Sequence, residues 1–124
     1  MFNVEGYRII LSRGDTGAVK VNAEATLAGE PYTFGADDRA LFSIKNGQGE
    51  IVMQRAFLME NNSFTVYFMN SDTDSLAPGD TYSWDVRYII NPYYDATGRI
   101  IDGDQVITPK EPQNMNLLAV VGDV

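Results

Sequence analysis

The sequence predicts an all-β protein, an antiparallel β-sandwich of seven or eight strands in a single domain over residues 1–124. Apolar and polar residues alternate at period two in one segment after another, which is typical of half-buried strands. Clusters of Gly, Pro, Asn and Asp separate these segments, as turns do. No segment shows the period of an amphipathic helix, and short strands joined by turns favour a sandwich.

The strands are predicted in chain order from their alternation and from the turn residues that bound them. The expected ranges are Gly6–Ser12, Ala18–Thr26, Arg39–Lys45, Glu50–Met59, Ser63–Asn70, Tyr82–Asn91 and Asn114–Val121, with Gln105–Thr108 as a short additional strand. In the second strand Val19, Val21 and Ala23 share one side, which we expect to pack on a core. Asn46–Gly49 predicts a hairpin turn, because Asn and Gly adopt positive φ at low cost.

Three longer connections interrupt this pattern. Leu27–Asp38 and Ser71–Asp80 are rich in turn residues, and we expect both to be loops, the first with a short extended piece near Tyr32. The pair Asn91-Pro92 is expected to end the sixth strand, because proline lacks the backbone N–H that a ladder needs. Tyr93–Asp104 then follows as an exposed excursion with a turn at its centre.

The sixth strand carries the most regular alternation in the chain. Its expected inward face holds Tyr82, Trp84, Val86, Tyr88 and Ile90. Tyr82 follows Leu76–Thr81, the position at which many Greek-key sandwiches place a tyrosine whose hydroxyl bonds back to the preceding connection. Two interpretations remain open at this point: such a tyrosine corner, or an ordinary turn before an aromatic strand.

The composition excludes several classes of function. The chain has 17 acidic and 9 basic residues, so its net charge of −8 disfavours nucleic acid and anionic membranes as partners. It contains neither cysteine nor histidine, which removes Ser-His-Asp and Cys-His triads and the commonest metal ligands. Its longest apolar runs are far shorter than a membrane span. We therefore expect no enzymatic activity, no cofactor and no metal.

Three short motifs occur in a recognisable order: Arg13-Gly14-Asp15, Phe42–Lys45 and Leu76–Val86. In this order the chain resembles the immunoglobulin-like N-terminal domain of baseplate upper proteins of phages that infect Gram-positive bacteria. The resemblance implies an antiparallel immunoglobulin-like β-sandwich and a phage or prophage structural protein. Pro92–Asp104 departs from the family, which has a shorter hairpin there.

The resemblance also implies where and with what such a protein works. It would be a virion protein, assembled in the host cytoplasm, that docks onto identical subunits or onto a larger virion protein. Within this chain the excursion is the expected contact surface, because exposed tyrosine is enriched at interfaces. Its interface candidates are Tyr93, Tyr94, Arg99, Ile100 and Ile101.

Other interpretations rest on smaller features. A carbohydrate-binding or adhesion module would need an aromatic platform, for which Tyr32, Tyr93 and Tyr94 are candidates. Loop carboxylates such as Asp37-Asp38 would have to act as a pair in a glycoside hydrolase.

Two further motifs are weaker. Asp72–Asp74 and Asp102–Asp104 invite a cation site, although neither continues as an EF-hand loop. Arg13-Gly14-Asp15 matches the integrin tripeptide, but the expected turn at this place already accounts for it.

Overall fold

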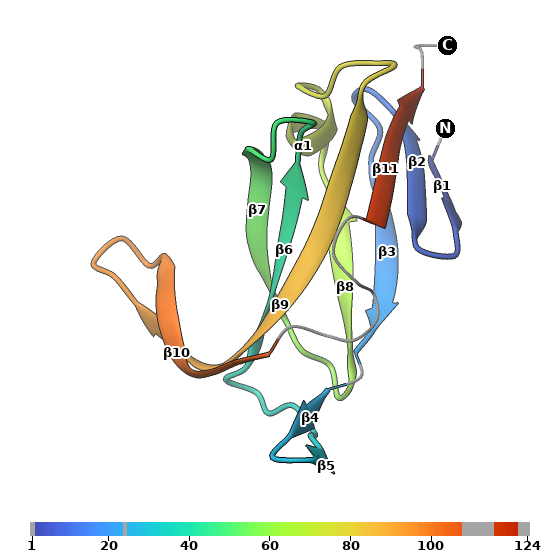
Figure 1. The fold of residues 1–124 in the computed structure, drawn as a ribbon. Helices are drawn as coiled ribbons and strands as arrows, with labels where there is room; N and C mark the ends of the chain where they lie inside the picture. Colours follow the sequence, from blue (N-terminus) through green and yellow to red (C-terminus); the bar gives the residue numbers. More distant parts are fainter. Residues whose placement is uncertain (1, 24, 108–115, 122–124) are drawn as a thin grey trace.

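The computed structural model describes residues 2–23, 25–107 and 116–121, and it is all-β apart from one short helix (Figure 1). The elements are β1 (Phe2–Glu5), β2 (Arg8–Ser12), β3 (Gly17–Asn22), β4 (Thr26–Leu27), β5 (Glu30–Pro31), β6 (Arg39–Lys45), β7 (Ile51–Leu58), β8 (Ser63–Phe68), α1 (Asn70–Thr73), β9 (Thr81–Tyr94), β10 (Ile100–Ile107) and β11 (Asn116–Val121). The predicted all-β class is therefore confirmed. No helix among the described residues is long and apolar enough to cross a membrane.

The strands form one large sheet and two small ones. The large sheet runs in the order β1-β2-β11-β9-β6-β7, with β10 also paired to β9, while β3 pairs β8 and β4 pairs β5. The expectation of purely antiparallel strands is wrong at one place, because β11 pairs β2 in parallel. After β2 the chain continues into β3, which belongs to another sheet. The edge of β2 that does not face β1 is therefore free, and it pairs with β11, which runs in the same direction.

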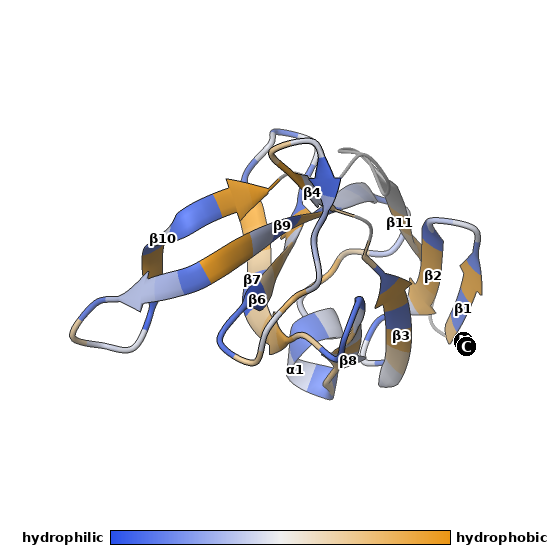
Figure 2. Cartoon of the chain, turned by 90° about the horizontal axis from the view of Figure 1, so that it is seen from below, coloured by the Kyte–Doolittle hydropathy of each residue, from blue (hydrophilic) through white to orange (hydrophobic). Residues whose placement is uncertain are grey.

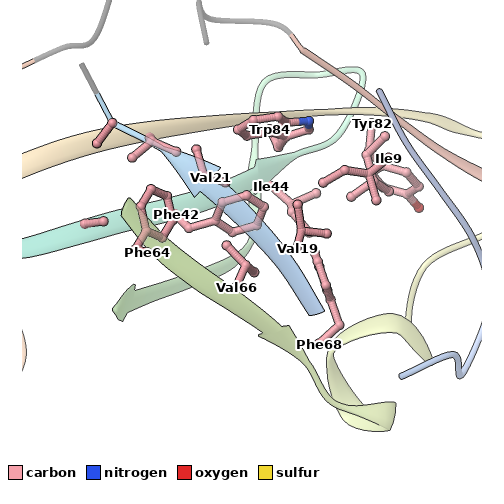
Figure 3. Packing of buried hydrophobic residues seen from close by; sticks show 14 of the residues in the cluster. Ile9, Val19, Val21, Phe42, Ile44, Phe64, Val66, Phe68, Tyr82 and Trp84 are labelled. Atoms are coloured by element: carbon pink, nitrogen blue, oxygen red, sulfur yellow. The ribbon is translucent and has the colours of Figure 1, made fainter. Parts of the chain in front are cut away.

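The core lies between the large sheet and the β3–β8 pair (Figure 3). The Phe42 ring stacks on that of Trp84 within the large sheet, with centroids 5.6 Å apart, and contacts that of Phe68 in the other layer at 5.9 Å. Phe64 contacts Tyr88 with ring centroids 6.0 Å apart. The inward faces predicted for the second, third and fifth strands are buried, which confirms the alternation there. In the sixth strand Tyr82–Tyr88 follow the prediction, but its end does not, because Ile89 is buried and Ile90 is half-buried.

Hydrogen bonds decide one interpretation that the sequence left open and confirm one predicted turn. The backbone N–H of Ala77 donates to the Tyr82 hydroxyl over 2.9 Å, so Tyr82 bonds back to the connection before its strand. The N–H of Asn46 donates to the carbonyl of Glu50, which closes the expected hairpin turn. The first bond holds the connection before β9 against that strand, and the second closes the turn between β6 and β7.

Several predicted boundaries differ from the structure; Thr108 and Asn114, predicted ends of strands, lie outside the described residues. The second strand ends at Asn22 instead of Thr26, and Ser71–Asp80 begins within the short helix α1. More consequential, β9 does not stop at Asn91-Pro92 but continues to Tyr94. Pro92 is tolerated because β6 has already ended at this level, so β9 has a single neighbour and one unpaired edge.

The Tyr82 hydrogen bond gives a stability prediction. We expect Tyr82→Phe to lower the free energy of unfolding by about 1 kcal/mol, because the Ala77 N–H loses its acceptor while the buried ring stays. Urea denaturation followed by Trp84 fluorescence measures it. Tyr67→Phe removes an exposed hydroxyl and is the matched control. Equal stability of the two variants would contradict the predicted role of this bond.

Candidate functional site

The extension of β9 and its partner β10 form a hairpin that projects from the two facing sheets (Figure 1). The last residue of β9 with a partner in β6 is Ile89, which lies opposite Arg39. Beyond it β9 pairs only with β10, as in Asp102 opposite Tyr93. We call Ile90–Ile107 the arm. The predicted exposed excursion, Tyr93–Asp104, is thus part of a two-stranded element.

A buried carboxylate holds the root of the arm. Asp38 is 4% exposed, and its Oδ1 accepts a hydrogen bond from the backbone N–H of Asn91 over 3.1 Å. Its Oδ2 accepts from the Tyr32 hydroxyl and from the N–H of Gly35, both over 2.8 Å. Asn91 has φ +48°, a conformation that bends the strand at this residue. Asp38 therefore ties the bend of the arm to the β3–β6 connection.

A close backbone approach tightens the arm just beyond this bend. Gly103 lies opposite Pro92, and a Cβ atom on Gly103 would come within 2.5 Å of Cγ2 of Ile89. Only glycine leaves room there for the Ile89 side chain to cross the hairpin. The first half of the arm is consequently closely packed, although it carries two strands only.

The tip of the arm is held by one side chain. Oδ1 of Asp95 accepts hydrogen bonds from the Thr97 hydroxyl, from the Thr97 N–H and from the Arg99 N–H, over 2.7 to 3.0 Å. The hydroxyl bond from Thr97, the backbone bonds and the Arg99 charge together lower the pKa of the Asp95 carboxyl below its usual value. The carboxylate is ionised at neutral pH and orders the turn that presents Arg99.

All five interface candidates lie on this arm. Tyr93, Tyr94 and Ile101 are 47%, 49% and 65% exposed, Arg99 is exposed and Ile100 is half-buried. The exposure predicted for Tyr93 and Tyr94 is confirmed, and apolar residues recur along both strands of the arm (Figure 2). Whether these residues make contacts stays a prediction. The sequence interpretation did not include Val106, which is exposed on β10, because it assigned that residue to a short strand separate from the excursion.

A groove separates the arm from the large sheet. It has a volume of about 400 Å³. One wall comes from the arm and the other from β6 and β7, whose outward residues there include Leu41 and Ala56. Its lining is Arg39, Leu41, Gln54, Arg55, Ala56, Tyr94, Gly98, Arg99 and Ile100. The sequence pattern gave Leu41 a solvent-facing position without a reason for an apolar residue there. The groove supplies that reason.

The groove carries positive charge in an acidic protein. The Arg55 side chain contributes none of this charge, because it lies on the inward face of β7, where it pairs with Asp72, with Nη2 and Oδ2 2.6 Å apart. Arg39 donates instead to the carbonyls of Ala36 and Asp38, each over 2.9 Å. Across the described ranges, neither Arg39 nor Arg99 lies within ion-pair distance of a carboxylate, although Arg99 is close enough to Asp95 to lower the pKa of that carboxyl. The groove lining includes no acidic residue. The arm therefore faces a surface that favours anionic groups.

The aromatic platform needed for glycan binding is not assembled. Tyr32 is half-buried, donates its hydroxyl to Asp38 and packs its ring against Phe34. Tyr93 and Tyr94 are consecutive strand residues, so their rings point to opposite faces of the arm. Tyr93 donates its hydroxyl to Asp104, whereas Tyr94 lines the groove. The three tyrosines thus do not share one surface.

The remaining carboxylate and tripeptide interpretations also lack a suitable geometry. Of the pair Asp37-Asp38, the second carboxylate is buried and already accepts three hydrogen bonds. Within the residues that the structure describes, no group of three or more potential ligands is placed to hold a metal ion. Asp15 accepts a hydrogen bond from the Ser12 N–H inside its own turn.

Comparisons with known proteins give no match: no family model, curated protein or solved structure is similar to this chain.

The root of the arm gives a second prediction. Asp38→Ala leaves the Gly35 and Asn91 N–H groups without an acceptor, so we expect unfolding to become easier by at least about 2 kcal/mol. Amide hydrogen exchange should also speed up in the arm more than in β3 and β8. Asp37→Ala, at the exposed neighbour, should leave both unchanged. Arm amides that exchange at the wild-type rate in Asp38→Ala would refute the anchor.

The same cluster makes stability depend on alkaline pH. Burial, with the Asp38 hydrogen bond and charge, raises the pKa of Tyr32 to about 12 from 10. Burial also raises the pKa of Tyr88. Above pH 10 the unfolded chain releases these protons while the folded protein retains them, so stability falls with rising pH.

We therefore expect the free energy of unfolding to decline between pH 10 and about 12. Tyr32→Phe should make this decline less steep, and Tyr67→Phe, at an exposed site, should leave it unchanged. Urea denaturation at a series of pH values measures the slope. A slope in Tyr32→Phe equal to that of wild type would contradict the assignment.

Proposed function

We propose that this chain is a structural assembly module that docks through its arm onto identical copies or onto a larger protein. In the setting that the motif resemblance implies, it is a phage or prophage virion protein assembled in the host cytoplasm. The observation that carries the docking role is the projecting arm, with Tyr93, Tyr94, Ile101 and Val106 between 47% and 65% exposed. Exposed tyrosine and isoleucine on a protruding element are costly in water and gain by burial against a partner.

The strand order supports an immunoglobulin-like interpretation of the fold. The path β11-β9-β6-β7 corresponds to the G-F-C-C′ order of variable-type domains, and the β3–β8 pair corresponds to strands B and E. On this correspondence the arm is the F–G connection. Variable domains use that connection for binding, so the analogy, which rests on fold alone, assigns the contact role to the same place.

The hydrogen bonds within the arm support docking as well. Binding by a mobile loop loses conformational entropy, and a preorganised element loses less. Asp38 fixes the root and Asp95 fixes the tip before any partner arrives. The arm can therefore present its side chains in one arrangement, as a subunit that repeats in an assembly requires.

We expect the purified chain to form a closed oligomer whose mass does not change over a concentration series, measured by size-exclusion chromatography with light scattering. Tyr93→Ser combined with Ile101→Ser should convert it to a monomer, because both side chains are exposed on the arm. Val4→Ser with Tyr67→Ser changes two residues that are also exposed but lie on β1 and β8. This control should retain the oligomer.

Two results would count against the proposal in different ways. An oligomer that survives the arm variant would remove the arm from the contact. A monomer at every concentration would remove identical copies as the partner; the protein would then have to be found in purified phage particles, and its absence from them would reject the virion role.

A further inference from the structure

We propose that the groove beneath the arm binds an extended, carboxylate-bearing segment of a partner protein. This inference rests on the proposed docking function and names the chemistry of what is docked. The groove is about 400 Å³, and its lining combines arginine with apolar and aromatic side chains. An acidic peptide with apolar residues between its carboxylates complements both components.

The charged side of this complementarity comes from two arginines that line the groove, with a third on the sheet beside it. Arg39 and Arg99 line opposite walls of the groove, and Arg87 lies directly opposite Leu41 in the β6–β9 register, on the same outward face. In the part of the chain that the structure describes, none of the three lies within ion-pair distance of a carboxylate. Guanidinium groups bind carboxylates through paired hydrogen bonds, which gives direction as well as attraction.

The apolar side comes from both walls as well. Leu41 on β6 and Ala56 on β7 are paired neighbours in the sheet, and Tyr94 and Ile100 are paired neighbours in the arm. All four line the groove. A segment passing between them would bury apolar surface on two sides while its carboxylates reach the arginines. A free small anion would use the arginines alone and leave the apolar walls exposed.

The backbone beside the groove also suits an extended segment. β9 has no β6 partner beyond Ile89, so its edge from Ile90 to Tyr94 is open on that side, apart from the Asn91 N–H that Asp38 accepts. An open strand edge offers unpaired backbone groups to an incoming strand. Nucleic acid fits less well, because the net charge of −8 repels a long polyanion before it reaches the groove.

Fluorescence anisotropy tests the inference with a labelled peptide in which aspartate alternates with valine. The asparagine version of this peptide is the uncharged probe, and single-stranded oligothymidylate is the competing polyanion. We expect wild-type protein to bind the aspartate peptide, and the asparagine peptide to bind much more weakly. Arg99→Gln should raise Kd about tenfold, because a charge-assisted hydrogen bond is lost. Arg8→Gln makes the same charge change at the exposed first residue of β2 and should leave Kd unchanged.

Three outcomes would overturn the inference: no binding of the aspartate peptide, equally tight binding of its asparagine version, or an equal loss of affinity in Arg99→Gln and Arg8→Gln. Tighter binding of oligothymidylate than of the aspartate peptide would indicate a nucleic acid as the ligand and would likewise reject a protein segment. The oligomer test is independent. If peptide binding fails while the Tyr93→Ser and Ile101→Ser combination still disrupts the oligomer, the docking function stands without the groove; the reverse result leaves the groove and rejects docking through the exposed residues of the arm.

Discussion

The hydrogen bonds of the Asp38 carboxylate connect the two parts of this protein, the layered core and the arm. A carboxylate withdrawn from water is costly unless donors surround it, and here the donors come from Tyr32, Gly35 and Asn91. The first two belong to the β3–β6 connection and the third to the bend in β9. Because one side chain satisfies all of them, the connection and the arm are ordered together. The groove exists only while that bend holds the arm over β6 and β7.

The bend also explains how β9, a strand of 14 residues, belongs both to the layered core and to the arm. From Tyr82 to Tyr88 its inward residues are buried against the opposite sheet, as a central strand requires. From Ile90 onward it has left β6 and carries exposed side chains. Asn91 accepts the positive φ that separates the two halves more readily than most residues, since asparagine tolerates this region. The same strand is therefore a central strand of the large sheet in its first half and one strand of the projecting hairpin in its second half.

The core and the exposure of the arm could be predicted from the sequence, because both depend on the pattern of neighbouring residues. Alternation placed Val19, Phe42 and Trp84 inside, and a run of polar residues around Tyr93 and Tyr94 placed those rings outside. Prediction from the sequence failed where the deciding contact is remote in the chain. Pro92 signals a strand end, and only the absence of a β6 neighbour makes it harmless. Asp38 reads as half of a surface carboxylate pair until Asn91 is brought beside it. The parallel β2–β11 pair joins the beginning and the end of the chain.

The sequence did not predict the groove, because its two walls come from residues that are remote in the chain. The charge of the groove consequently differs from what the composition suggests. Counted along the chain, 17 acidic and 9 basic residues describe a protein that repels anions. Folding places Arg39, Arg87 and Arg99 on one side, where the groove lining brings no carboxylate. Long-range repulsion acts on extended polyanions and is screened within about 8 Å at physiological salt, whereas a hydrogen-bonded carboxylate feels the arginines at contact. The acidic exterior and the basic groove together therefore favour a short acidic segment over a long polyanion.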